Sequence, residues 1–151
     1  MKRVDLYVET SIKGPRQRDG TAGYVIQYIC RNGQPATCTD FWRIEGMSAH
    51  ESILAAAVRG MKRIKAGCEI IIHTDDAWIA SAVNSWMKDW ERRGWVTGTG
   101  GEVKHKEMFE KIAGRRKTDL VAVENGLGEE YAEYLRYNIQ KKEEERSRET
   151  A

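Results

Sequence analysis

Residues 68–74 are the feature that most limits how this chain can fold. They read Cys-Glu-Ile-Ile-Ile-His-Thr, a nearly continuous apolar run with helical patterns on both sides. Such a run is typical of a central strand that is covered on both faces of a sheet. A strand that is reached through helices lies parallel to its neighbour. The segment therefore predicts an α/β domain with a parallel portion in its sheet.

Hydrophobic periodicity predicts the other elements. Further strands are expected at 3–10, 22–30, 36–45 and 119–124, and helices at about 49–65, 76–92, 104–115 and 129–146, with a polar loop at 12–20. At 151 residues, one domain is expected. We expect it to span 1–140, followed by a charged C-terminal tail, 141–151, that is solvated or frayed.

The three cysteines do not suggest a disulfide framework. Asn32-Gly33 predicts a two-residue hairpin turn, which places Cys30 opposite Pro35 instead of Cys38. The chain opens on no signal-peptide pattern, and its apolar runs are too short to span a membrane. A cytoplasmic monomer with reduced thiols is expected.

Charge is concentrated in one region of the chain. The net charge is only +2, but residues 86–117 hold nine Lys or Arg against five acids. A basic patch on a nearly neutral chain is typical of a surface that faces phosphates.

Four carboxylates each stand next to a predicted structural boundary. Glu9 ends the first strand, Glu51 opens a helix, Asp75 follows the strand at 68–74, and Glu133 lies in the last helix. Hard cations such as Mg²⁺ prefer oxygen ligands, and a pair of such ions can clamp a scissile phosphate. If the fold gathers these acids, they predict a divalent-metal site.

From about residue 3 to about residue 139, the element order and the local motifs resemble type 1 ribonuclease H. The matching stretches are Tyr7-Val8-Glu9-Thr10-Ser11, Ala49-His50-Glu51-Ser52, Thr74-Asp75-Asp76, Glu130-Tyr131-Ala132-Glu133-Tyr134-Leu135 and the tryptophan-rich Trp86-Met87-Lys88-Asp89-Trp90-Glu91-Arg92-Arg93-Gly94-Trp95. The last of these has the tryptophan spacing and basic pair of the bacterial enzymes' basic handle.

The resemblance implies a five-stranded mixed sheet, flanked by helices, in which strand 2 is antiparallel to the others. It implies cleavage of the RNA strand of RNA/DNA hybrids by two Mg²⁺ or Mn²⁺ ions. The implied catalytic metal ligands are Glu9, Glu51, Asp75 and Glu133. The residues expected to contact the hybrid or another nucleic-acid duplex are Trp86, Trp90, Arg92, Arg93, Trp95, Lys104 and Lys106.

The chain also departs from the family pattern. Glu9 and Glu133 replace aspartates, Thr10 replaces a glycine, and Met47-Ser48-Ala49 replaces an Asn-rich stretch that reads the hybrid. The loop at 124–129 lacks the histidine that many members carry. The extra methylene of Glu9 moves its carboxylate by roughly 1.5 Å, whereas productive sites tolerate about 0.5 Å.

Each candidate metal ligand also has a purely structural interpretation. Asp75 can cap the following helix, and Glu51 can form a capping box with Ser48. Glu9 can simply end a strand, and Glu133 can pair with Arg136 at i+3.

The aromatic and basic residues have structural alternatives as well. Trp86 and Trp90 can pack a helix hairpin, although we expect one ring to be packed and the other to lie near nucleic acid. The basic residues can form an ordinary solvated face. His73 is expected to be buried and hydrogen-bonded, and His105 is the one histidine considered for substrate contact.

Two functions follow as hypotheses. The first is a metal-dependent ribonuclease H that is weak or prefers Mn²⁺, because four acids remain at the four expected positions. The alternative is a non-catalytic nucleic-acid- or protein-binding module with a degenerate ribonuclease H fold, which the Glu9 replacement favours. A weaker third option is a nuclease of the same fold that acts on DNA.

Overall fold

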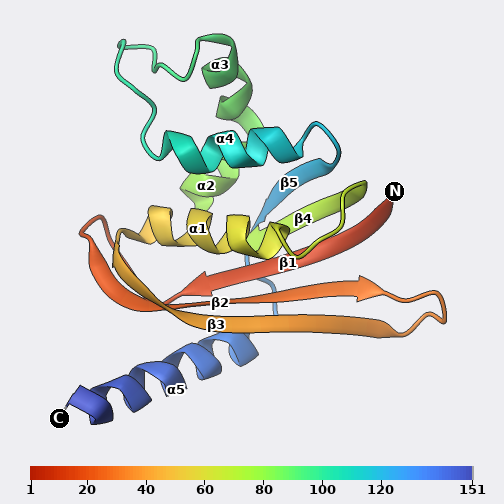
Figure 1. Ribbon diagram of the computed structural model, residues 1–151, viewed down its shortest axis with the longest axis vertical. Coiled ribbons are helices and arrows are strands. Elements are labelled where there is room, and N and C mark those ends of the chain that lie inside the picture. Colours follow the sequence, from red (N-terminus) through yellow and green to blue (C-terminus); the bar gives the residue numbers. More distant parts are fainter. Residues whose placement is uncertain (151) are drawn as a thin grey trace.

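The computed structural model describes residues 1–150, which form one mixed five-stranded sheet with helices on both faces (Figure 1). In the order β3-β2-β1-β4-β5, the strands are β3 (Pro35–Met47), β2 (Arg18–Ile29), β1 (Lys2–Thr10), β4 (Cys68–Thr74) and β5 (Leu120–Asn125). Strand β2 is antiparallel to β1 and β3, whereas β1, β4 and β5 run parallel. The predicted fold class and the antiparallel second strand are therefore confirmed.

The helices divide unequally between the two faces (Figure 1). On one side lie α1 (Ala49–Met61), α2 (Ala77–Ser81), α3 (Met87–Arg92) and α4 (Lys106–Arg115), and on the other lies α5 (Ala132–Thr150). A π-helical turn, η1 (Ala82–Trp86), joins α2 to α3, so the helix predicted at 76–92 has three parts.

Each face of the sheet buries its own apolar cluster. Side chains alternate along β1, so Leu6 and Val8 join the large core under α1, while Tyr7 joins Val25 and Leu135 under α5. Helix α1 lies close to β1 because Gly60 has no side chain. A Cβ at Gly60 would lie 2.6 Å from Leu6 Cδ1.

A buried ion pair connects the elements on the α1 side. Arg115 at the end of α4 donates to Asp119, with 2.9 Å between Nε and Oδ1. It also donates to the carbonyls of Met61, the last residue of α1, and of Ile64 and Lys65 just beyond it. Asp119 in turn accepts from the amide of Cys68 at 2.9 Å, at the start of β4. This cluster fixes the ends of α1 and α4 relative to the sheet.

The turn between β2 and β3 differs from the prediction. Ile29 pairs with Pro35, and the amide of Cys30 donates to the carbonyl of Gln34, so the loop is three residues long instead of two. Cys30 therefore lies opposite Gln34, not Pro35. Cys38 pairs with Ile26, and all three cysteines are free thiols, as expected.

The last helix begins and ends later than predicted. It was expected at 129–146, but α5 begins at Ala132 and continues to Thr150, so the charged segment 141–150 is helical. Glu143 explains the continuation, because its Oε1 accepts from Thr21 Oγ1 at 2.6 Å and from Ser11 Oγ at 3.0 Å. These partners are more than 120 positions away, beyond the reach of local patterns. Within residues 1–150, none of the helices combines the length and the apolar composition that crossing a membrane requires.

Candidate functional site

Two of the four predicted metal ligands meet at the carboxyl ends of neighbouring parallel strands. Glu9 lies at the end of β1, and Asp75 directly follows β4, which pairs with β1 in parallel. Parallel strands end at the same edge of a sheet, and ligands bind preferentially there. The strand that most limits the fold therefore also delivers Asp75 to this edge.

Glu9 and Asp75 line a small cleft of about 160 Å³. Its other lining residues are Thr10, Ile12, Lys13, Ala49, Ile53, Thr74 and Asp76. Three carboxylates and two threonines contribute oxygen atoms to it, and oxygen is the ligand that Mg²⁺ and Mn²⁺ prefer.

Both carboxylates are engaged by cationic side chains. Arg136, on α5, lies between them, with its Nε 3.3 Å from Glu9 Oε2 and its Nη2 2.6 Å from Asp75 Oδ2. Lys13 Nζ is 3.4 Å from Glu9 Oε1, and the Leu127 amide donates to Asp75 Oδ1 at 2.7 Å. Arg136, considered above as an i+3 partner of Glu133, pairs instead with the two cleft acids.

Glu51 lies beside the cleft instead of in its lining. Its amide donates to Ser48 Oγ at 3.4 Å, so Ser48 caps α1 as predicted. Its carboxylate faces His105, with 4.0 Å between Oε2 and Nδ1, in a separate groove between α1 and residues 102–108. Glu51 is thus near the expected position but turned toward the segment before α4.

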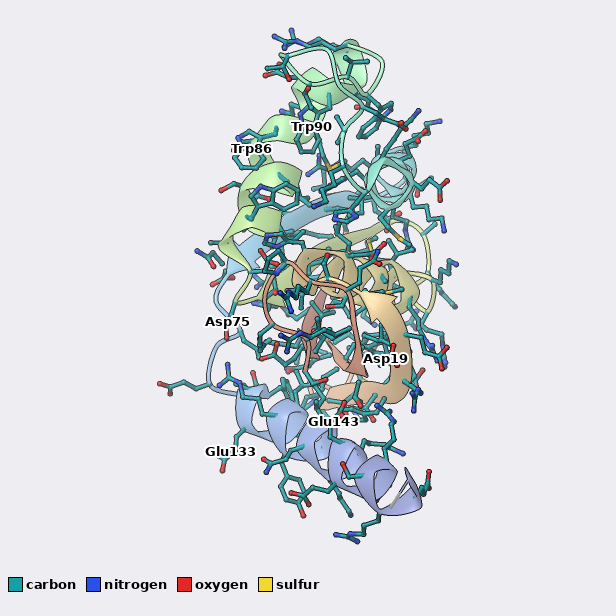
Figure 2. The ribbon with its side chains drawn as sticks, turned by 90° about the vertical axis from the view of Figure 1, so that its left-hand side faces the viewer. Asp19, Asp75, Trp86, Trp90, Glu133 and Glu143 are labelled. Atoms are coloured by element: carbon teal, nitrogen blue, oxygen red, sulfur yellow. The ribbon has the colours of Figure 1, made fainter. Side chains whose placement is uncertain are left out.

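Glu133 lies apart from the other acids. It is exposed in the first turn of α5 and does not line the cleft. Figure 2 shows it well below Asp75, with its side chain directed away. Across residues 1–150, no cluster of three or more His, Cys, Asp or Glu is arranged to hold a metal ion. The donors therefore fit a hard cation by chemistry, but they are only partly assembled.

Asp76 is a cleft residue that sequence reasoning missed. It caps α2, because its Oδ1 accepts from the Ile79 amide at 3.1 Å, and the capping role considered for Asp75 is therefore wrong. The other oxygen of Asp76 is 2.5 Å from His50 Nδ1, and the His50 ring stacks on Trp78. The Thr74-Asp75-Asp76 order was the available signal, since either aspartate could open the helix.

The tryptophans of the handle, residues 86–95, combine packing with exposure. Trp90 packs edge-on against Phe109, with 5.2 Å between ring centroids, and is partly buried against the core. Trp86 contacts both Trp78 and Trp90 yet keeps 39% of its surface exposed. Figure 2 places Trp86 and Trp90 above Asp75. Trp90 is therefore the packed ring that was expected, and the contact of Trp86 with nucleic acid stays a prediction.

The basic residues of 86–117 also divide into two groups. Arg92, Arg93 and Lys104 are exposed, and Arg92 pairs with Asp89. Lys106 lies 3.8 Å from Glu102, and Trp95 is partly buried against the core. Arg115 and Arg116 instead turn inward and donate to backbone carbonyls, including Val121 from Arg116. The basic surface is therefore smaller than the sequence count predicts.

The histidines follow their local environments. His73 is buried, and its Nε2 lies 2.8 Å from Asp5 Oδ1, as predicted. His105 adopts a left-handed backbone with φ of 61° before α4. Burial lowers the pKa of His105, while nearby Glu51 opposes that change. His105 therefore lies next to Glu51 with the neutral imidazole favoured.

Comparison with known proteins identifies the family to which this fold and sequence belong. The RNase H family model matches residues 1–125, most of the chain. The chain belongs to the RNase H family. Ribonuclease HI of Xylella fastidiosa (strain 9a5c) is 32% identical over 126 residues, covering 80% of this chain and 77% of that protein. Ribonuclease H of Pseudomonas fluorescens (strain Pf0-1) is 26% identical over 110 residues, covering 72% and 67%. Family and relatives place this RNase H protein among ribonuclease H-type endoribonucleases, which are hydrolases.

Solved structures share the RNase H fold. LC9-RNase H1, a type 1 RNase H with the type 2 active-site motif, has a TM-score of 0.69 at 18% identity, covering 91% of this chain and 70% of that one. The N-terminal RNase H domain of rv2228c from Mycobacterium tuberculosis, in a maltose-binding-protein fusion, has a TM-score of 0.62 at 11% identity and full coverage of both chains. The family match contains Glu9, Glu51 and Asp75 and ends before Glu133.

Proposed function

We propose that this RNase H protein is a divalent-metal-dependent endonuclease that cuts the RNA strand of RNA/DNA hybrids. The observation that carries this proposal is the meeting of Glu9 and Asp75 in one cleft at the ends of two parallel strands. A bound Mg²⁺ or Mn²⁺ ion supplies a Lewis acid and an activated water for phosphodiester hydrolysis. The two-ion count and the Mn²⁺ preference remain predictions.

The chain holds both carboxylates in fixed orientations. Glu9 is buried, and its Oε1 accepts from the amide of Thr10 at 3.1 Å. The Leu127 amide orients Asp75 from the opposite side of the cleft. Oxygen donors whose positions are set by backbone amides are prepared for a ligand before it arrives. These two residues therefore support the metal-binding role best.

The handle supports a duplex substrate. The phosphates of a hybrid can pair with exposed cations such as Arg93 and Lys104, and the exposed Trp86 ring offers an aromatic surface. A foamy viral protease-reverse transcriptase, which shares the fold with a TM-score of 0.60 at 15% identity, has been solved in complex with an RNA/DNA hybrid. The hybrid is therefore the first substrate to test.

The decisive experiment is cleavage of a hybrid with a labelled RNA strand and a separately labelled DNA strand. Reactions contain Mg²⁺ or Mn²⁺, and Asp75→Asn is compared with the wild-type chain. We expect cuts in the RNA strand alone and a loss of more than about 100-fold in the variant, because a ligand of the ion is removed.

Asp19→Asn is the matched control, because Asp19 lies on the other side of the molecule in Figure 2 and pairs with Arg43. It should cleave like the wild-type chain. Wild-type rates in Asp75→Asn would refute the assigned site. No cleavage with either ion, together with salt-sensitive hybrid binding, would favour the non-catalytic binding module. Cuts in a DNA duplex would favour the third option.

A further inference from the structure

The Arg136 guanidinium occupies the space between the two cleft carboxylates. It is 2.6 Å from Asp75 and 3.3 Å from Glu9. Arginine does not lose its proton in proteins, so this group is a permanent positive charge. The position between Glu9 and Asp75 therefore already holds one cation that belongs to the chain.

The mobility of the charged groups differs across the cleft. The Glu9 side chain is 8% exposed, whereas those of Arg136 and Lys13 are 55% and 73% exposed. A buried strand-end carboxylate cannot move far, but a long exposed cation can shift into water at little cost. Of the two carboxylates, Lys13 contacts only Glu9, whereas Arg136 contacts both, so an arriving ion would displace Lys13 and leave Arg136 in place.

The free carboxylates of the cleft leave room for one divalent ion. Of the three that line it, Asp76 is engaged elsewhere, because it caps α2 and lies 2.5 Å from His50 Nδ1. The other two predicted acids lie outside the cleft lining. Glu9 and Asp75 therefore remain as the acids for an ion, and Arg136 already contacts both of them, which leaves donors for one ion instead of two.

We propose that this site takes one divalent ion and that Arg136 is its resident second cation. The inference rests on the proposed metal-dependent function and replaces the two-ion expectation. In this arrangement Arg136 is a positioning residue, because its contacts with both Glu9 and Asp75 fix the distance between the two carboxylates. It also supplies positive charge where the scissile phosphate would approach, with a planar group suited to phosphate oxygens.

The test counts Mn²⁺ ions on the full chain without nucleic acid. Free Mn²⁺ is followed by electron paramagnetic resonance during titration of the wild-type chain, Asp75→Asn and Arg136→Gln. We expect one ion per wild-type chain and loss of that ion in Asp75→Asn. Arg136→Gln keeps a side chain of similar length without the charge, so it should bind about tenfold more tightly or take a second ion.

Arg148→Gln is the matched control, because Arg148 is exposed near the other end of α5. It should bind Mn²⁺ like the wild-type chain, and thermal melts check that each variant is folded. Two Asp75-dependent ions on the wild-type chain, or identical binding by wild type and Arg136→Gln, would overturn the inference. Hybrid cleavage on the same samples separates the two proposals. Cleavage with two ions bound refutes the single-ion site alone, whereas absence of both binding and cleavage refutes both.

Discussion

Two arginine–carboxylate clusters in this protein use the same chemistry in opposite surroundings. Arg115 and Asp119 are enclosed, with side chains 17% and 0% exposed, whereas Arg136 reaches Glu9 and Asp75 from an exposed helix face. The Arg115 guanidinium also donates to three carbonyls at the end of α1 and just beyond it, so it connects several elements at once. Burial and shared contacts make the first cluster structural, whereas exposure leaves the second, which also includes Lys13, able to exchange cations with solvent.

The largest expected stability effect is on the buried cluster. Asp119→Asn removes a fully buried charge from a largely enclosed arginine, so the free energy of unfolding should fall by about 3 kcal/mol. Asp75→Asn removes a carboxylate that is half exposed, so the free energy of unfolding should fall by less than about 1 kcal/mol. Urea denaturation followed by circular dichroism measures both. Equal losses in the two variants would contradict the distinction between a structural cluster and an exchangeable one.

The buried Asp119 should also make the stability of the protein depend on pH in the acid range. Burial raises the pKa of Asp119, but hydrogen bonds from Arg115, Thr118 and the Cys68 amide outweigh burial and hold that pKa well below the usual range of an aspartate. A carboxyl group whose pKa is lowered by folding stabilises the protein above its unfolded pKa. This contribution is lost as the pH falls through the folded pKa.

Stability measured from pH 5 downward should therefore drop less steeply below about pH 4 in Asp119→Asn than in the wild-type chain. Asp19→Asn, at an exposed carboxylate, should keep the wild-type slope. The same slope in all three proteins would show that Asp119 is not a source of acid sensitivity.

A smaller effect is expected from shortening Glu9. Glu9→Asp withdraws the carboxylate by roughly 1.5 Å, and its 3.3 Å contact with Arg136 is the longer of the two arginine contacts. Loosening that contact should free a Glu9 oxygen for the divalent ion while Arg136 stays on Asp75, so the Mg²⁺-dependent cleavage rate should rise by about tenfold. An unchanged rate in a folded variant would mean that neighbouring residues such as Thr10 limit the site.

Much of the fold was predictable because its signals are local. The apolar run at 68–74 identified a central strand, and alternation located β1 and β3 closely. The π-helical turn was not predictable, since helical periodicity does not register one extra residue. That turn contains Asn84, whose side-chain amide exchanges two hydrogen bonds with the backbone of Val123 in β5. Its stabilising partner is therefore distant in sequence.

The candidate site was predictable only where strand ends determine it. Glu9 and Asp75 converge because their strands are adjacent and parallel, which the element order implied. Helical positions were harder, because the rotation of α5 decides which side chain faces the cleft. One turn separates Glu133 from Arg136, and that difference selects the arginine. Spacing along a helix could not reveal this choice without the packing of Leu135 under the sheet.

The smallest expected stability effect is on a third arginine–carboxylate pair, on the handle. Arg92 pairs with Asp89 at i+3, with both side chains largely exposed to water. Asp89→Ala should change the free energy of unfolding by less than about 0.5 kcal/mol, because solvent screens such pairs. The same change should strengthen hybrid binding at low salt, since removing the acid leaves Arg92 available to phosphate.

Binding measured over a series of salt concentrations checks both directions. Arg92→Glu should weaken hybrid binding and make its salt dependence shallower, whereas Asp89→Ala should make it steeper, by about one phosphate contact in each case. Indifference of binding to both variants would remove Arg92 from the nucleic-acid surface. The Arg92–Asp89 pair would then contribute neither to stability nor to nucleic-acid binding. Across the three arginine–carboxylate pairs, those of Arg115, Arg136 and Arg92, the loss of stability on mutation should increase with burial. The effect on ligand binding should be confined to the two exposed pairs.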